Sequence, residues 1–465
     1  MFIGRTRELR TLNRLYESES FQFPVIYGRR RVGKTTLINK FIGRKPAIFF
    51  TAVESDAGTN LYNLGRAVSL YENPDRDPQL ARPFSSFQQA FETIFELART
   101  QRVVFVIDEY PYLAKAEPSV SSILQALIDR HSNESRLFLM LCGSSLSFMK
   151  EQVLSEKSPL YGRRTAQIEL KPFDFFDSAL FFPDRNPLEA AQIYGMVGGI
   201  PLYLNQFTGR GTLRQVTEAA LLDPNAILYE EPLNLLLQEV SKPPRYNAVI
   251  GAIASGRTQS SEIASAVGLS TAELSYFLKE LERIGLVEKE YPIIKSSKRP
   301  LYQLSDNLYR FWFRFVLPHT SSLERGMAGR AWRAIEAGLP SYMGPVFETI
   351  CRQWLWRQAE AGLLPIEFDD IGRWWGTDPA RREEAEIDLV AIADGAVVLT
   401  GECKWRGDDF PFTALEKLAN RTDLVGGSSS TQLYGFSKTG FSSSCRVEAQ
   451  QHGNVHLVSF GEMLD

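Results

Sequence analysis

The sequence contains few of the residues that build metal clusters or disulfide frameworks. Of its 465 residues, four are cysteine and four are histidine. The cysteines lie far apart, with no C-x-x-C pair and no nearby histidine, so a zinc site is not expected. We expect four buried, reduced thiols, as in a cytoplasmic protein: Cys142, Cys351, Cys403 and Cys445.

Long hydrophobic runs and a strong net charge are also missing. No apolar run approaches about 18 residues, the length that could span a membrane, and the first residues have no signal-peptide core. We therefore expect a cytoplasmic protein with no membrane partner. The formal net charge is −3, which argues against a chain that coats nucleic acid but leaves room for a local basic groove.

The remaining composition is that of a globular protein of several domains. Hydrophobic residues make up 44% of the chain and charged residues 23%, as in ordinary globular proteins. A chain of 465 residues is too long for one hydrophobic core and indicates about three domains.

One glycine-rich stretch fits a phosphate-binding motif in full. Gly28-Arg-Arg-Arg-Val-Gly-Lys34-Thr35 matches G-x-x-x-x-G-K-[ST], and it lies between an apolar run (23–27) and a helical run (36–42). In such a loop the backbone N–H groups point at phosphate oxygens. Lys34 would reach the β- and γ-phosphates of ATP, and Thr35 would place its hydroxyl on Mg²⁺. The residues expected to contact the nucleotide are Gly28, Arg29, Arg30, Arg31, Val32, Gly33, Lys34, Thr35 and Thr36.

A second strand carries the acidic residues that such a loop requires. The run 103–107 is continuously apolar and ends in Asp108 and Glu109. A strand buried on both faces belongs to a helix-covered parallel sheet, and ligands gather at its carboxyl end. We expect Asp108 to hold Mg²⁺ and Glu109 to orient or deprotonate the water that attacks the γ-phosphate.

The next segments allow more than one interpretation. The strand 137–143 ends in Ser144-Ser145, where a hydroxyl either senses the γ-phosphate or caps a helix. Arg163 and Arg164 precede the strand 167–170. By themselves they are a basic pair on the surface. The resemblance to known ATPases given below implies instead a finger that completes a neighbouring subunit's ATP site, which requires an oligomer.

The middle of the chain predicts a helix-turn-helix followed by a hairpin. Helices are expected at 246–254 and 260–267, and a third opens with the capping box Ser270-Thr-Ala-Glu273. Strands are expected at 286–291 and 301–304, and together these elements indicate a winged helix. The third helix has a net negative charge, which favours a role in protein contacts over DNA reading. The basic hairpin 295–299 could still touch phosphates. The aromatic segment 306–316 could stack nucleic-acid bases, but its spacing favours a buried interdomain helix.

The tail holds a second group of charged residues. Glu348 lies in an expected helix, Asp388 in the expected strand 386–393, and Glu402 and Lys404 in the returning strand from Ala396. Glu402 and Lys404 are two residues apart and therefore share a face. For Asp388 to join that face it must pair with an even-numbered residue. A two-residue Asp-Gly turn would pair it with Gly401, so an odd-length loop or a β-bulge is required.

This group is suited to phosphodiester hydrolysis. Carboxylates supply the oxygen ligands of Mg²⁺, and a lysine can lie beside the attacking water. We expect Asp388 and Glu402 to bind the metal, Glu348 to converge on the same site, and Lys404 to stand alongside. The alternatives are a solvated strand edge or a nuclease fold that has lost its activity.

These motifs together resemble a known protein family. The opening Phe2–Glu8 and the segment Gly198-Gly-Ile-Pro201 are similar to AAA+ and STAND relatives of origin-recognition ATPases, in which Pro201 would lie in a lid over the base. The glycines and the proline are also typical of an ordinary turn between helices. The order Glu348, Asp388, Glu402-x-Lys404 resembles the PD-(D/E)XK nuclease core. The whole chain resembles archaeal and bacterial ATPases that join such an ATPase to a winged helix and a C-terminal DUF234 domain.

The resemblance implies an α/β fold and a division into four domains. These are a P-loop ATPase core (1–175), a helical lid (176–240), a winged helix (241–318) and a restriction-endonuclease-like α/β domain (319–465). It implies ATP and Mg²⁺ as cofactors, DNA as a partner, an ATP-regulated nuclease as the activity, and homo-oligomers as a possible assembly. The chief alternative is a non-catalytic STAND-like ATP switch that assembles protein partners.

Overall fold

The chain folds into two compact units, which we describe separately. The computed structural model describes residues 2–75, 77, 82–240, 243–294 and 300–464. The first unit comprises Met1–Pro172 with Ile200–Leu202 and Arg283–Gly285, and the second comprises the remainder. The finer division into four domains stays a prediction. None of the described helices is both long and apolar enough to cross a membrane.

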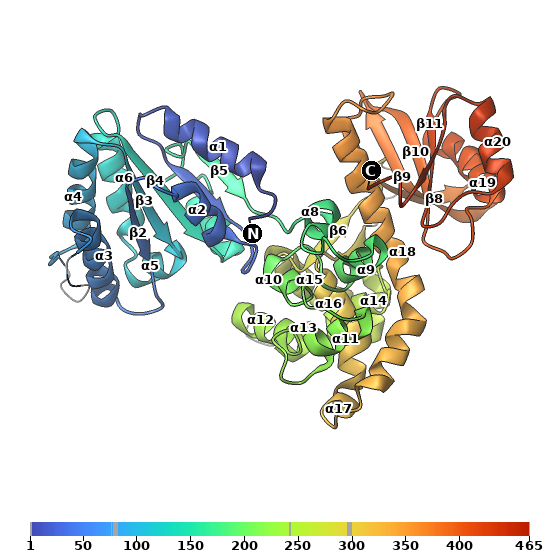
Figure 1. Ribbon diagram of the computed structural model, residues 1–465, viewed down its shortest axis with the longest axis horizontal. Coiled ribbons are helices and arrows are strands. Elements are labelled where there is room, and N and C mark those ends of the chain that lie inside the picture. The colour runs from blue at the N-terminus through green and yellow to red at the C-terminus, as the bar shows by residue number, and fades with distance from the viewer. Residues whose placement is uncertain (1, 76, 78–81, 241–242, 295–299, 465) are drawn as a thin grey trace. The chain divides into compact units, whose positions relative to one another are not determined.

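The first unit is built on a parallel sheet (Figure 1). Its five strands run in the order β2-β3-β4-β1-β5, and every neighbouring pair is parallel. Because all strands point the same way, the segments that follow β1, β3 and β4 emerge at one edge of the sheet. The strands are β1 (Pro24–Tyr27), β2 (Ala47–Thr51), β3 (Val103–Asp108), β4 (Leu137–Gly143) and β5 (Ala166–Glu169).

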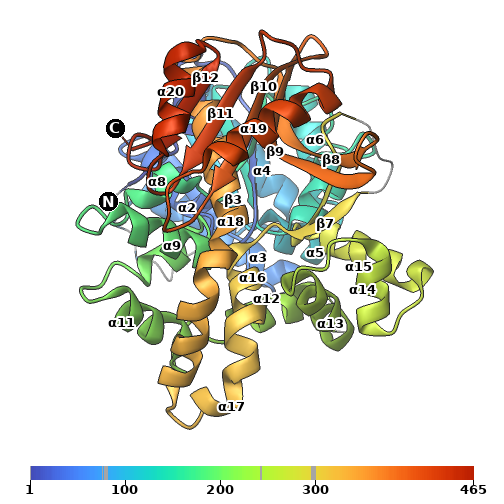
Figure 2. The ribbon, with the colours of Figure 1, turned by 90° about the vertical axis from the view of Figure 1, so that its right-hand side faces the viewer.

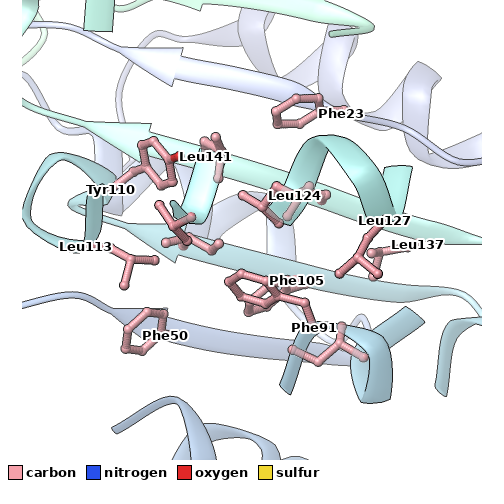
Figure 3. Packing of buried hydrophobic residues seen from close by; sticks show 14 of the residues in the cluster. Phe23, Phe50, Phe91, Phe105, Tyr110, Leu113, Leu124, Leu127, Leu137 and Leu141 are labelled. Atoms are coloured by element: carbon pink, nitrogen blue, oxygen red, sulfur yellow. The ribbon is translucent and has the colours of Figure 1, made fainter. Parts of the chain in front are cut away.

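Helices cover both faces of this sheet, which explains its continuous apolar runs. On one face Phe50 and Phe105 pack with Phe91 and Leu124 (Figure 3). On the other face the ring of Phe138 contacts one aromatic ring of α1 and one of α2. The helices are α1 (Thr6–Glu17), α2 (Lys34–Ile42), α3 (Ala57–Glu72), α4 (Phe87–Thr100), α5 (Tyr110–Ala116), α6 (Val120–His131), α7 (Leu146–Phe148) and η1 (Met149–Val153).

The second unit begins with helices and a hairpin. The last three of its first helices, α13 to α15, come directly before the antiparallel pair β6 (Val287–Glu290) and β7 (Leu301–Leu304). This is the element order of a winged helix, and that assignment stays a prediction. The expected capping box is present, because Ser270 and Glu273 bond each other's backbone N–H groups. The basic hairpin 295–299 lies outside the described residues. The helices up to this hairpin are α8 (Phe175–Ala179), α9 (Pro187–Val197), α10 (Pro201–Asn205), α11 (Leu213–Thr217), η2 (Glu218–Leu222), α12 (Glu231–Glu239), α13 (Pro243–Ala254), α14 (Ser260–Val267) and α15 (Thr271–Arg283).

The aromatic segment that follows belongs to the core. Tyr309, Phe311 and Trp312 are buried, so these rings have no free face on which a nucleic-acid base could stack. The expectation of a buried helix is therefore confirmed. The segment comprises α16 (Asn307–Phe311) and η3 (Trp312–Val316), and η4 (Leu317–His319), α17 (Thr320–Leu323) and the long helix α18 (Ala328–Glu360) follow it.

A mixed sheet closes the second unit, in the order β12-β11-β10-β9-β8. β8, β9 and β10 pair antiparallel, and β10, β11 and β12 pair parallel. Thr400 bonds Thr422 of α19, whereas the ring of Phe436 contacts Trp354 of α18, so the two helices cover opposite faces (Figure 2). The elements are β8 (Asp370–Asp378), β9 (Glu383–Ala393), β10 (Ala396–Lys404), α19 (Phe412–Thr422), η5 (Asp423–Val425), β11 (Gln432–Ser437), α20 (Ser443–Gln451) and β12 (Val455–Ser459).

The four cysteines agree with the expectation from the sequence. All four are buried, and none forms a disulfide.

Candidate functional site

The phosphate-binding loop connects β1 to α2 and depends on two glycines. Gly28 has φ 155°, and a Cβ at that position would lie 2.3 Å from the carbonyl oxygen of Leu170. Any larger residue would therefore clash with the backbone after β5. Gly33 has φ 91° and stands at the N-cap of α2, a left-handed conformation that favours glycine. The glycine spacing of the motif thus follows from the path of the backbone.

Lys34 is buried at the start of α2 and turns back onto the loop. Its Nζ donates to the carbonyl oxygens of Gly28 at 2.9 Å and Arg29 at 3.0 Å. Burial lowers the pKa of the Lys34 ammonium from its usual value, and the carboxylates of Glu109 and Asp108 oppose this shift. The ammonium therefore lies within the loop, in the electrostatic reach of both acidic residues that follow β3.

Thr35 and Asp108 bring two hard oxygens together. The Thr35 hydroxyl donates to Asp108 Oδ2 at 3.2 Å, although the residues are far apart in sequence. Asp108 is 5% exposed, and its other oxygen accepts from the backbone N–H of Glu109 at 3.0 Å. A hydroxyl and a fixed carboxylate side by side suit the oxygen preference of Mg²⁺. These residues therefore fit the metal expected from the sequence.

Glu109 is held in a strained and defined position. Its backbone is left-handed, with φ 52° and ψ 44°, a conformation that is costly for a residue other than glycine. Its Oε2 accepts from the Ser144 hydroxyl at 2.7 Å and the Ser144 N–H at 3.3 Å. Ser145, at the N-cap of α7, makes no side-chain capping bond. Of the two interpretations of these serines, the helix-cap role is thus not seen, and Ser144 bonds the acidic residue instead.

We predict that Ser144→Ala lowers ATP turnover by about 10- to 100-fold while nucleotide affinity changes little. The hydroxyl fixes the direction of the Glu109 carboxylate, so its loss leaves that carboxylate free to rotate. Steady-state hydrolysis and a nucleotide-binding titration would measure the two effects separately. Ser145→Ala is the matched control, and equal turnover in both variants would contradict the positioning role.

The other residues expected near the nucleotide are distributed around the loop. Arg30 donates to the hydroxyl of Tyr112 at 3.1 Å, and Arg31 has φ 71°. Val32 is buried, and Thr36 lies in the first turn of α2. A Cβ on Gly33 would lie 3.7 Å from Pro201 Cγ. The nucleotide contacts of these residues stay predictions.

Sequence reasoning did not assign Arg5 to this site. Its guanidinium donates to the carbonyl oxygens of Val32 at 3.1 Å and Lys171 at 2.7 Å, so it ties the N-terminal segment to the loop. Arg5 has φ 60°. The Phe-Ile-Gly-Arg opening resembles a nucleotide-clasping segment, but that resemblance does not single out Arg5.

Arg163 and Arg164 make local contacts in this chain. Arg163 holds both carboxylate oxygens of Asp129, at 2.6 Å and 2.7 Å. The Arg164 guanidinium lies 5.4 Å from the centre of the Tyr161 ring. A finger role for Arg163 would therefore require the Asp129 pair to open, and it stays a prediction.

In the second unit, the β-bulge that the site requires is present. The turn is two residues long, since Ala396 pairs with Ala393, and the register then shifts between Val397 and Leu399. Gly401 consequently pairs with Leu389, and the next position in this register sets Glu402 opposite Asp388. The expectation of an even-numbered partner is thus met, and the extra residue in β10 is what achieves it.

Asp388 is buried beside other charged residues. It is 9% exposed, and its Oδ2 accepts from the backbone N–H of Cys403 at 2.8 Å. Burial raises the pKa of the Asp388 carboxyl well above its usual value, and the charges of Glu402 and Glu348 raise it further. Lys404 forms an ion pair with Glu402. Four charged side chains from α18, β9 and β10 therefore influence one another.

Arg373 of β8 was absent from our expectations and changes the site. It lies opposite Asp388 and Leu389, where two residues of β9 face one of β8. Its guanidinium pairs with Glu348 at 3.5 Å, and with Glu290 and Glu386 at 3.6 Å each. Burial disfavours its charge, but the carboxylates together outweigh burial and raise the pKa of the guanidinium.

The expected convergence of the carboxylates on a single Mg²⁺ site is therefore not seen in this arrangement. Among the described residues, no three His, Cys, Asp or Glu side chains are grouped so as to hold a metal ion. The physical reason is that Glu348 neutralises Arg373, Glu402 neutralises Lys404, and one oxygen of Asp388 is used by the backbone. The oxygen chemistry suits Mg²⁺, and binding of the metal at these residues stays a prediction.

Two parts of the chain match known protein families. Residues 2–207 match a family described as an ATPase domain predominantly from Archaea. Residues 312–417 match the family DUF234, which is described as archaeal and bacterial proteins of unknown function.

Two proteins of Methanocaldococcus jannaschii and one solved structure are similar to this chain. The uncharacterised protein MJECL04 is 34% identical over 409 residues, which cover 87% of this chain and 88% of that protein. The uncharacterised ATP-binding protein MJ0423 is 47% identical over 45 residues, 10% of this chain and 76% of that protein. The Walker-type ATPase PABY2304 of Pyrococcus abyssi has a TM-score of 0.51 at 20% identity, covering 67% of this chain and 96% of that one, so it shares the fold.

Three observations agree with one another. The loop depends on its glycines, the oxygens of Thr35 and Asp108 are paired, and the similarity to MJECL04 is extensive. The chain belongs to the family of ATPases that join an ATPase domain found predominantly in Archaea to a C-terminal DUF234 domain.

Proposed function

We propose that this chain hydrolyses ATP with Lys34, Thr35, Asp108 and Glu109. Lys34 would hold the β- and γ-phosphates, and Glu109 would orient the attacking water. The observation that carries this proposal is the fixed geometry of Glu109, whose carboxylate accepts two hydrogen bonds from Ser144. A glutamate without such support would sample several rotamers and orient water poorly.

Thr35 and Asp108 would hold the Mg²⁺ that accompanies ATP. The metal would supply positive charge that offsets the charge developing on the phosphates. The chain's own contribution is to keep the two oxygens 3.2 Å apart at the edge of the sheet where the loop also lies. Steady-state ATP hydrolysis with and without Mg²⁺ tests this proposal, and we expect turnover only with the metal.

We further propose that the second unit cleaves a phosphodiester bond in DNA. Support comes from the bulge that sets Glu402 opposite Asp388 and from the Lys404 ammonium on Glu402. Lys404 could donate to the scissile phosphate, and the buried carboxylates could hold a divalent cation. This activity requires that Arg373 first release Glu348, because the Glu348 carboxylate cannot pair fully with both the Arg373 guanidinium and a metal ion.

We predict that Arg373→Gln binds Mn²⁺ about tenfold more tightly than the unchanged chain. Removal of the guanidinium leaves partly buried carboxylates without a counter-charge, which should also lower the melting temperature. Added Mn²⁺ should then restore part of that stability, since it binds only the folded state. Calorimetric titration and thermal unfolding measure the two effects in nucleotide-free protein.

Arg381→Gln serves as the control for that variant, because Arg381 is exposed at the β8–β9 turn. If Arg373→Gln and Arg381→Gln bind Mn²⁺ equally, then Arg373 does not compete with a metal. In that case the carboxylates serve only to anchor β8.

The second candidate function is a non-catalytic ATP switch that assembles protein partners. The ion pairs of Arg373 favour it, because they leave no group of three metal-binding side chains among the described residues. Incubation with single- and double-stranded DNA and with RNA, in Mg²⁺ or Mn²⁺, separates the two functions. Products that disappear with a chelator support the nuclease, and intact substrates in every condition support the switch.

A further inference from the structure

We propose that a pocket in the second unit binds a phosphate group. The pocket has a volume of about 240 Å³ and lies between the end of α13, β7, α16 and the middle of α18. Three arginines line it: Arg310, Arg314 and Arg373. None of its lining residues, all of which the structure describes, is an aspartate or glutamate. The charged side chains that line the pocket are therefore all positive.

Two of these arginines have no carboxylate partner. Among the described residues, neither Arg310 nor Arg314 forms an ion pair, whereas Arg373 pairs with three carboxylates. Arg310 Nε is buried and has no hydrogen-bond partner among the described residues, and its Nη2 donates to the Tyr342 carbonyl oxygen at 3.4 Å. A buried donor without a partner is costly, and an anion in the pocket would satisfy it.

The ring of Tyr342 lies beside both arginines. It lies 4.4 Å from the Arg310 guanidinium and 6.0 Å from that of Arg314. The ring is itself fixed, because the Tyr342 hydroxyl donates to the carbonyl of Gly195 at 2.8 Å. Guanidinium groups held on an aromatic ring lose little entropy when they bind, and their planar donors match phosphate oxygens.

The remaining lining supports the same ligand. Thr258 and Ser341 contribute hydroxyl groups, which can donate to phosphate oxygens. Asp306 is the N-cap of α16, and its carboxylate accepts from the N–H groups of Leu308 and Tyr309. Asp306 is not among the residues that line the pocket.

The position of the pocket indicates where the phosphate comes from. Arg373 lines the pocket and also contacts Glu348, so the pocket adjoins the carboxylates proposed for phosphodiester cleavage. A strand whose scissile phosphate lies at those carboxylates would place a neighbouring phosphate here. This choice of source rests on the proposed nuclease function, whereas the phosphate site itself does not.

The test is a calorimetric titration of the full chain with pyrophosphate at low ionic strength. Lys34→Ala is introduced throughout to weaken binding at the ATP site. We expect pyrophosphate to bind and added salt to weaken that binding. Arg314→Gln and Arg310→Lys should each weaken it by about tenfold. Arg310→Lys keeps the charge but loses the planar fork. Arg330→Gln, on the exposed start of α18, should bind as the parent does.

A second titration with an eight-nucleotide DNA strand that has no terminal phosphate identifies the source. Arginine-dependent binding of this strand supports a backbone phosphate. Arginine-dependent binding of pyrophosphate alone supports a free phosphate and overturns the nucleic-acid source. Unchanged pyrophosphate affinity in both arginine variants, with melting temperatures like the parent's, would overturn the site. Neither titration depends on cleavage, so failure of the nuclease proposal would be seen separately.

Discussion

Lys34→Ala is expected to reduce ATP turnover by about 100-fold or more and to weaken nucleotide binding. The ammonium is the buried cation of the loop, and it is 6% exposed between backbone carbonyls and two carboxylates. Its removal takes away the charge that would hold the β- and γ-phosphates during transfer. Steady-state phosphate release and a titration with a fluorescent ATP analogue would measure both losses.

Lys40→Ala is the matched control, because Lys40 is an exposed residue of the same helix. It should retain the turnover and affinity of the unchanged chain. Should Lys34→Ala hydrolyse ATP as fast as Lys40→Ala, then the glycine-rich loop is not the site of hydrolysis.

Asp388→Asn and Lys404→Ala are each expected to lower DNA cleavage by about 100-fold or more while ATP hydrolysis is retained. Asp388 is the buried carboxylate opposite Glu402, and asparagine keeps its shape without the negative charge. Lys404 is the ammonium on Glu402, and alanine removes the donor to the scissile phosphate. A gel assay of cleavage and a phosphate-release assay on the same preparations would show the separation.

Asp394→Asn and Lys417→Ala are the matched controls. Asp394 lies in the exposed turn between β9 and β10, and Lys417 is exposed on α19. Cleavage that survives in both Asp388→Asn and Lys404→Ala would place the nuclease elsewhere. Parallel loss of ATP hydrolysis would indicate a folding defect, and thermal unfolding of each variant would show it.

The ATP site could be predicted from the sequence because its residues follow buried strands. The run 103–107 showed that β3 is buried on both faces, and parallel strands bring their carboxyl ends to one edge. The contact between Thr35 and Asp108 follows from that rule. The hydrogen bond from Ser144 to Glu109 did not follow, because it depends on the insertion of β4 between β1 and β3.

The tail site could be predicted in part. The parity of strand pairing required a bulge or an odd loop before Glu402 could oppose Asp388, and the bulge is present. Arg373 could not be anticipated, because β8 was not recognised and its ion pairs join β6, α18 and β9. Such long-range pairs have no local signal in the sequence. The strand pairing predicted for the tail site was thus correct, whereas its predicted set of charged residues was incomplete.

The most direct test of ATP hydrolysis by this site is single-turnover hydrolysis of radiolabelled ATP by Glu109→Gln beside the unchanged chain. Glutamine can accept the hydrogen bonds from Ser144 but is a far weaker base, so ATP should bind while hydrolysis slows by about 100-fold or more. Glu96→Gln, on α4, is the control. Hydrolysis at the unchanged rate in Glu109→Gln would contradict the assignment of the catalytic site.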